Sequence, residues 1–116
     1  MKTKIFTFLI AFHASLFTLH LSAQDTIYVP QDHQSIQAAI DAAVDGNVIL
    51  VDTGTYLENI SFKGKAITLA SKYIWSQDEF YRDHTVIDGS NAPDPDSATT
   101  VLFISGEDST SVLTGF

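Results

Sequence analysis

The sequence predicts an all-β fold of stacked coils, a solenoid, whose N-terminal end is covered by one short amphipathic helix. Three observations lead to this prediction. An apolar stripe with helical spacing begins at Ile36, apolar runs without helical periodicity follow it, and these runs recur at near-equal intervals. Eighteen positions separate Ile49 from Ile67, and nineteen separate Ile67 from Val86. Such a spacing is typical of stacked repeats.

Residues 1–23 have the layout of a secretory signal peptide. Lys2 and Lys4 precede an apolar run, residues 5–19, without an acidic residue, and small Ala23 stands at the expected cleavage point. The run is shorter than the about 20 residues that span a bilayer. We therefore expect a mature domain of residues 24–116 that is secreted, periplasmic or on the cell surface, without a membrane contact after cleavage. N-terminal sequencing of the exported protein should begin at or near Gln24.

The charge balance excludes some classes of partner. The chain carries 14 acidic and 6 basic side chains, and two of the basic ones lie in the predicted signal peptide. A strongly acidic mature chain repels nucleic acid, so no nucleic-acid partner is expected. The chain has no cysteine, so an exported form has no disulfide to stabilise it.

The first predicted elements are a strand and a helix. Residues 26–29 form a short extended segment that Pro30 ends. The helix follows, with Ile36 and Ile40 on its apolar face and Ser35 or Asp32 as its N-cap. Gly46 stands where a helix C-terminus favours a left-handed residue. Because so short a helix is marginal alone, its apolar face must pack on another element.

The remaining elements are predicted strands. Residues 48–51 and 59–62 flank a corner at Gly54, and the ring of Tyr56 is expected to pack on that corner with its hydroxyl in water. Further apolar runs cover residues 66–70, 85–88, 100–104 and 111–116, with turn residues between them. A β-sandwich or meander is the alternative, although no hairpin turn joins two close alternating strands.

The order of these motifs resembles a known superfamily. A capped helix, residues 36–43, is followed by Asp45-Gly46, the strand 48–51, the segment Gly54-Thr55-Tyr56-Leu57-Glu58 and the runs 65–69 and 85–89. This order is similar to the opening coils of right-handed parallel β-helix proteins of the pectin lyase-like superfamily. The resemblance implies a right-handed single-stranded parallel β-helix with an N-terminal capping helix. It also implies that catalytic residues lie several coils later, beyond the residues present here.

Four aromatic residues in one segment are the main candidate for a binding site. Tyr73, Trp75, Phe80 and Tyr81 lie within nine positions between two predicted strands. The functional interpretation is a carbohydrate platform on a loop, because flat rings stack on sugars. The structural interpretation is that some of these rings fold back and cover the stack.

Other candidate sites have weaker patterns. The loop 88–97 offers Asp88, Asp94 and Asp96 as hard oxygen ligands for calcium, the one cofactor considered, although it lacks the order of a calcium-binding loop. Asp52 and Glu58 flank the Gly54 corner as a conceivable acid/base pair. The histidines at 33 and 84 are isolated, and the sequon at 59–61 lies inside a predicted strand.

Two function classes follow from the sequence. The first is an exported, non-catalytic module that binds polysaccharide or another cell-envelope partner. The second is the N-terminal part of a polysaccharide-active enzyme, a pectate lyase, pectinesterase or glycoside hydrolase. No catalytic constellation stands in these residues. The chain also stops at Phe116 within an apolar run. We therefore expect it to be the beginning of a longer solenoid, and to self-associate through its open end.

Overall fold

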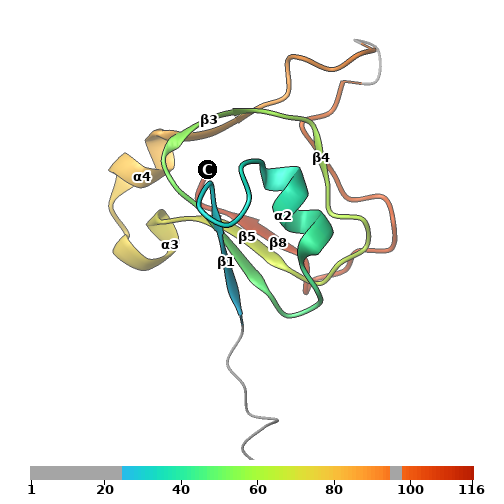
Figure 1. The fold of residues 1–116 in the computed structure, drawn as a ribbon, viewed down its shortest axis with the longest axis horizontal. Coiled ribbons are helices and arrows are strands. Elements are labelled where there is room, and N and C mark those ends of the chain that lie inside the picture. The colour runs from blue at the N-terminus through green and yellow to red at the C-terminus, as the bar shows by residue number, and fades with distance from the viewer. Residues whose placement is uncertain (1–24, 95–97) are drawn as a thin grey trace, which may run out of the picture.

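The computed structural model describes residues 25–94 and 98–116, whose strands all pair in parallel (Figure 1). The predicted signal peptide, the predicted first mature residue Gln24 and Asp96 lie outside these residues. The largest sheet has the order β1-β2-β5-β8, and two-stranded sheets pair β3 with β6 and β4 with β7. The strands are β1 (Thr26–Val29), β2 (Val48–Val51), β3 (Gly54–Leu57), β4 (Ile60–Ser61), β5 (Thr68–Ser71), β6 (Thr85–Asp88), β7 (Val101–Leu102) and β8 (Val112–Thr114).

The prediction of an all-β, right-handed β-helix is wrong. The described residues form a small compact α/β domain with short parallel strands in three sheets and with three helices, α2 (Ile36–Ala42), α3 (Tyr73–Ser76) and α4 (Glu79–Asp83). The spacing that suggested repeats does not correspond to strand pairing. Ile49 pairs with Leu69 rather than with Ile67, and Val86 pairs with Thr55 in a different sheet. The residues at these near-equal intervals are therefore not structurally equivalent.

Helix α2 forms where the apolar stripe predicts it. Its N-cap is Ser35, whose hydroxyl accepts a hydrogen bond from the amide of Ala38 at 3.1 Å. Ile36 and Ile40 are fully buried in the core cluster, as the stripe predicts. The helix ends at Ala42, earlier than expected. Gly46, with φ of +95°, therefore belongs to the following turn and not to the helix terminus.

Two charged side chains from other elements hold the ends of α2. The Glu58 carboxylate accepts hydrogen bonds from the amides of Ile36 and Gln37 at 2.8 and 2.9 Å. At the other end, the Lys65 ammonium donates to the carbonyls of Ile40, Asp41 and Ala43 at 2.7, 2.9 and 2.7 Å. A carboxylate at the N-terminus and an ammonium at the C-terminus both complement the helix dipole. These contacts fix α2 on the sheets.

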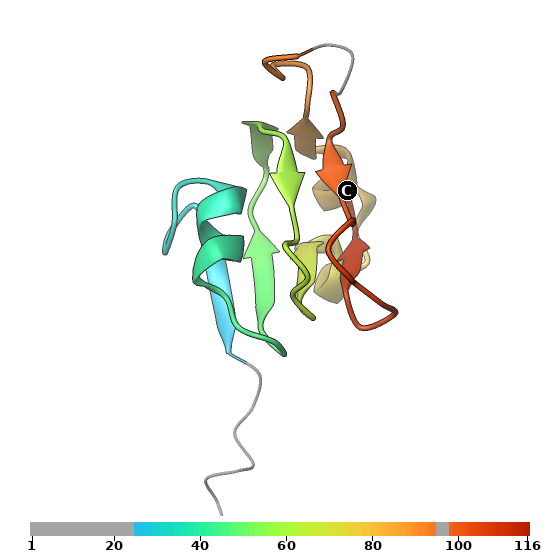
Figure 2. The same cartoon turned by 90° about the vertical axis from the view of Figure 1, so that its right-hand side faces the viewer.

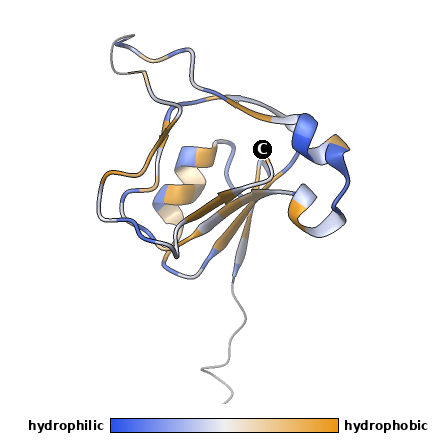
Figure 3. Cartoon of the chain, turned by 180° about the vertical axis from the view of Figure 1, so that it is seen from behind, coloured by the Kyte–Doolittle hydropathy of each residue, from blue (hydrophilic) through white to orange (hydrophobic). Residues whose placement is uncertain are grey.

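The core lies between α2 and the strands (Figure 2). Ile27, Ile49, Leu69 and Leu113 occupy matching register positions across the four strands of the largest sheet. Ile49 and Leu69, in the two inner strands, are fully buried. Figure 3 shows hydrophobic residues along these strands and a mostly hydrophilic α4. Removing the side chains of Ile49 and Leu69 from water stabilises this sheet.

The chain bends at Thr53, next to the predicted corner at Gly54, and the structure differs from the prediction in two respects. Gly54 has φ of +152°, and a Cβ there would lie 3.4 Å from the Tyr56 ring, so the ring packs on the glycine. The Tyr56 hydroxyl does not point into water, because it donates a hydrogen bond to the Asp52 carbonyl at 2.9 Å. Burial, followed by the nearby charges of Asp52 and Glu58, raises the pKa of Tyr56. The corner residues themselves form β3, an element that the sequence did not predict.

Candidate functional site

The four predicted platform residues lie on two short helices, α3 and α4, rather than on a loop. Figure 1 shows both helices together outside the sheets. Tyr73 and Trp75 belong to α3, and Phe80 and Tyr81 belong to α4. The sequence prediction missed these helices because four or five residues are too few to show helical periodicity. We call Tyr73, Trp75, Phe80 and Tyr81 together the aromatic surface.

Local hydrogen bonds define the two helices. Gln77 ends α3 in the left-handed conformation, with φ of +59°, and its amide donates to the Tyr73 carbonyl at 2.9 Å. Asp78 then caps α4, since its carboxylate accepts from the Phe80 amide at 2.9 Å. The Thr85 hydroxyl donates to the Tyr81 carbonyl at 2.5 Å and so ties α4 to β6. The rings are therefore presented from a fixed backbone.

Two of the four rings are strongly exposed. The exposed fraction is 61% for Trp75 and 51% for Phe80. Tyr73 and Tyr81 are half-buried. Large apolar side chains this exposed on neighbouring short helices are the kind of surface feature that often marks a binding site. The alternative, that these rings fold back and cover the core, does not describe Trp75 or Phe80.

Ring contacts hold part of the aromatic surface in place. Phe80 stacks on His84 with ring centroids 4.2 Å apart, and it meets Tyr81 edge-on at 5.5 Å. The Arg82 guanidinium lies 5.8 Å from the centroid of the Tyr73 ring, within the range of a cation–π contact between α4 and α3. His84, predicted to be an isolated loop residue, is therefore a packing partner of the surface, although it remains exposed.

The charges around the aromatic surface are mainly negative. Asp78, Glu79 and Asp83 lie in or next to α4, which carries one basic residue, Arg82. Arg82 forms ion pairs with Glu79 at 3.0 Å and with Asp83 at 2.8 Å, and these carboxylates raise the pKa of Arg82. The nearby Lys72 pairs with Asp52 at 3.0 Å. The two cations next to the rings are thus already neutralised by carboxylates of the chain.

The predicted calcium ligands are only partly described. Asp88 ends β6, and its carboxylate accepts from the Ser90 amide at 2.9 Å. The hydrogen bond of the Ser90 side chain, followed by that of its amide, lowers the pKa of Asp88. Asp94 follows in the next segment, and Asp96 lies outside the described residues. Within residues 25–94 and 98–116, no group of three histidine, cysteine, aspartate or glutamate side chains is placed to hold a metal ion.

The two carboxylates considered as an acid/base pair have structural partners. Asp52 pairs with Lys72, whose hydrogen bond, followed by that of the Thr53 amide, lowers the pKa of Asp52. Glu58 binds the N-terminal amides of α2. The side-chain Nδ2 of Asn59, the sequon residue, donates to the carbonyls of Gly89 and Thr99 at 2.8 and 3.0 Å. These polar side chains near the corner therefore stabilise the fold.

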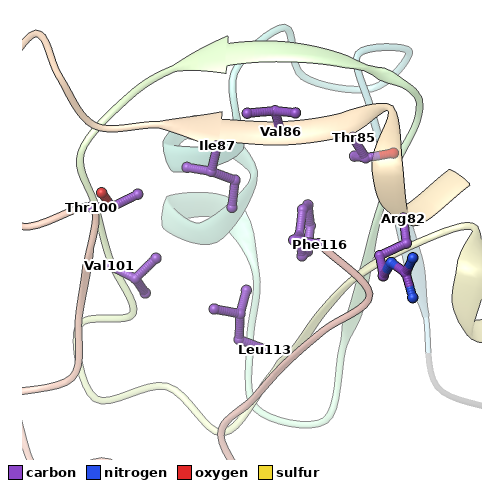
Figure 4. Close-up of a pocket in the computed structure, with 8 residues that line it drawn as sticks. All are labelled: Arg82, Thr85, Val86, Ile87, Thr100, Val101, Leu113 and Phe116. Atoms are coloured by element: carbon purple, nitrogen blue, oxygen red, sulfur yellow. The ribbon is translucent and has the colours of Figure 1, made fainter.

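An apolar pocket, which sequence analysis did not identify, lies where β6, β7 and β8 meet (Figure 4). Its volume is about 260 Å³. The lining residues are Arg82, Thr85, Val86, Ile87, Thr100, Val101, Leu113 and Phe116. They come from segments up to 34 positions apart, between Arg82 and Phe116, so only the fold brings them together.

In the described part of the chain, no helix has the length and apolar character needed to cross a membrane. No protein-family model, no curated protein and no solved structure matches this chain.

Proposed function

We propose that this chain is an exported, non-catalytic binding module whose aromatic surface on α3 and α4 holds a polysaccharide. The observation that carries the proposal is the joint exposure of Trp75 and Phe80 on two neighbouring capped helices. Each ring offers an apolar face to the C–H groups of a sugar ring. Beside them, Gln77 and Glu79 are exposed; Gln77 Nε2 donates to the carbonyls of Tyr73 and Ile74, and Glu79 Oε1 pairs with Arg82. Their other side-chain oxygens supply acceptors for sugar hydroxyls.

The contacts of the two candidate acids favour a binding function over a catalytic one. Asp52 and Glu58, the pair that flanks the corner, are engaged with Lys72 and with the α2 amides. A general acid or base needs a side chain that reaches the reacting atoms of a bound substrate. For the rings of the aromatic surface to bind a sugar, by contrast, they need only to be exposed and held in place.

The acidic residues in and next to α4 favour a neutral glycan over an anionic one. Three acidic residues, Asp78, Glu79 and Asp83, lie in or next to α4, and the guanidinium of Arg82 already pairs with two of them. A uronate-rich chain would bring further negative charge to this surface, and like charges at an interface are unfavourable. The surface therefore suits a neutral polysaccharide better than an anionic one such as polygalacturonate.

Trp75→Ala should weaken retention on a neutral polysaccharide at least about tenfold, the scale expected when a central aromatic contact is removed. Because the indole is 61% exposed, the fold should not depend on it, and the circular dichroism spectrum should stay unchanged. Affinity electrophoresis in gels that contain a neutral β-glucan measures the change. A parallel gel with polygalacturonate should retard the unmodified chain less.

Tyr28→Ala is the matched control. Tyr28 is an aromatic residue on β1 with 39% of its side chain exposed, outside the aromatic surface. This variant should keep the retention of the unmodified chain. Equal losses in the two variants, or no retention of the unmodified chain on any glycan, would show that α3 and α4 do not form a polysaccharide site.

A further inference from the structure

Three polar side chains follow the ends of neighbouring strands in the largest sheet. Lys72 comes directly after β5, Asp52 comes directly after β2, and Gln31 stands two positions after β1. The last residues of these three strands pair with one another in parallel register. The three side chains therefore follow one another along the same edge of the sheet. We call Gln31, Asp52 and Lys72 together the polar row.

Asp52, the middle residue, holds the polar row together. Its carboxylate pairs with the Lys72 ammonium at 3.0 Å and accepts from the Thr53 amide at 2.8 Å. Its own amide donates to the Val29 carbonyl, at the end of β1, at 2.8 Å. The hydrogen bond of Lys72 is the main cause of the lowered pKa of Asp52, and the Gln31 side chain, which lies beside the carboxylate, contributes to it. The side chains of the row are thus held relative to one another.

The polar row is accessible and carries no net charge. The exposed fraction of the side chain is 39% for Lys72 and 31% for Asp52, and Gln31 is exposed. An ammonium has three N–H donors, and a side-chain amide has both donors and an acceptor. Lys72 and Gln31 can therefore bond to a ligand while Asp52 keeps them in place. Because the charges of Lys72 and Asp52 cancel, the row suits uncharged hydroxyl groups.

The polar row is continuous with the aromatic surface. Lys72 has helical backbone angles, φ of −64° and ψ of −10°, and its carbonyl accepts from the amides of Trp75 and Ser76 at 3.1 Å each. Residues three positions apart lie on the same side of a helical turn, as Lys72 and Trp75 do here. Figure 1 shows α3 next to the end of β5. The indole and the first residue of the polar row therefore belong to one surface.

We propose that the glycan site includes both parts, so that the aromatic surface stacks on one stretch of the sugar chain and the polar row binds the hydroxyls of the units beside it. The inference rests on the proposed function and extends it. Neighbouring strands lie about 4.8 Å apart, so the row spans about 10 Å across three strands. That length exceeds a single pyranose ring. The ligand class is accordingly an extended stretch of a neutral polysaccharide and not one terminal sugar.

Tryptophan fluorescence measures binding at this surface directly, because Trp75 is the only tryptophan of the chain. The probes are a disaccharide and a hexasaccharide of the same neutral β-glucan. The unmodified chain should bind the hexasaccharide at least about tenfold more tightly, since only the longer probe reaches hydrogen bonds on both the row and the rings.

Two variants remove donors from the two ends of the polar row. Lys72→Met should raise the dissociation constant of the hexasaccharide at least about fivefold, and Gln31→Ala about threefold, with a smaller effect on the disaccharide in each case. Lys63→Met is the matched control, because Lys63 is another exposed lysine, paired with Asp41 at 2.9 Å outside both parts of the site. Exposed ion pairs contribute little to stability, so all three variants should fold, which circular dichroism checks.

The failure of this proposal differs from the failure of the proposed function. Equal affinity of the unmodified chain for the two probes would overturn the extended site and leave the aromatic surface as a glycan site. Folded Lys72→Met and Gln31→Ala variants that bind the hexasaccharide as tightly as the unmodified chain would do the same. If the unmodified chain binds neither probe and no neutral glycan retains it, the proposed function is wrong and the extended site is wrong with it.

Discussion

Ile40→Asp should destroy the folded state, whereas Asp41→Ala should leave it nearly intact. Ile40 has no exposed surface and lies on the face of α2 that packs into the core cluster. An aspartate there would bury a charge without a partner, at a cost of several kcal/mol. That cost is comparable with the whole stability of a small domain, about 5 to 15 kcal/mol. Soluble yield and a urea unfolding curve followed by circular dichroism measure the difference.

The adjacent residue is a sharp control for this prediction. Asp41 is exposed, and its carboxylate pairs with Lys63 at 2.9 Å, with both side chains largely in solvent. The hydrogen bond from Lys63, followed by that from Gln37, lowers the pKa of Asp41. Exposed pairs contribute only about 0 to 1 kcal/mol, so Asp41→Ala should shift the urea midpoint slightly. A similar loss of yield in both variants would contradict the assignment of the α2 apolar face.

Local patterns in the sequence predicted several elements well. The apolar stripe identified the buried face of α2, and compact apolar runs identified β2 and β6 with their observed bounds. The N-cap also agrees, because Ser35 was one of the two residues proposed. These features depend on neighbouring residues, whose spacing the sequence displays directly.

The sheet assignment needed information that the linear pattern does not contain. The run at residues 85–88 pairs with β3, an element that looked like a corner because Gly54 begins it. Strand β8 pairs with β5 across an interval of 44 positions, from Leu69 to Leu113. Apolar spacing alone cannot tell which strands become neighbours, and the inferred repeat failed for that reason.

The candidate site was also predictable only in its local features. The cluster of aromatic residues was visible in the sequence, but its backbone was not, because a left-handed Gln77 and a capping Asp78 create two helices too short for periodicity. The carboxylates that pair with Arg82 lie three positions before it and one position after it, so these ion pairs are partly predictable from the sequence. The apolar pocket could not be predicted, since its lining residues meet only after the three sheets form.

Lys65→Met should destabilise the domain by about 2 to 4 kcal/mol, although Lys65 lies in a turn that the sequence marks only as polar. Its ammonium donates three hydrogen bonds to carbonyls at the end of α2, where the backbone hydrogen bonds of the helix run out. Of these carbonyls, that of Ile40 also accepts from the Ala43 amide at 3.1 Å. Methionine keeps the aliphatic stem and removes every donor. The carbonyls of Ile40 and Ala43 belong to buried residues, so water replaces the lost bonds poorly.

Lys63→Met provides the comparison, since it is the same substitution two positions away. Lys63 makes an exposed pair with Asp41, and its loss should cost less than about 1 kcal/mol. Urea unfolding of both variants should therefore show a large decrease in midpoint for Lys65→Met and a small one for Lys63→Met, with equal slopes. If the two midpoints move together, net charge rather than capping of α2 explains the loss. A decrease confined to Lys65→Met means that one ammonium, reaching across from a distant turn, completes a helix that is too short to be stable by itself.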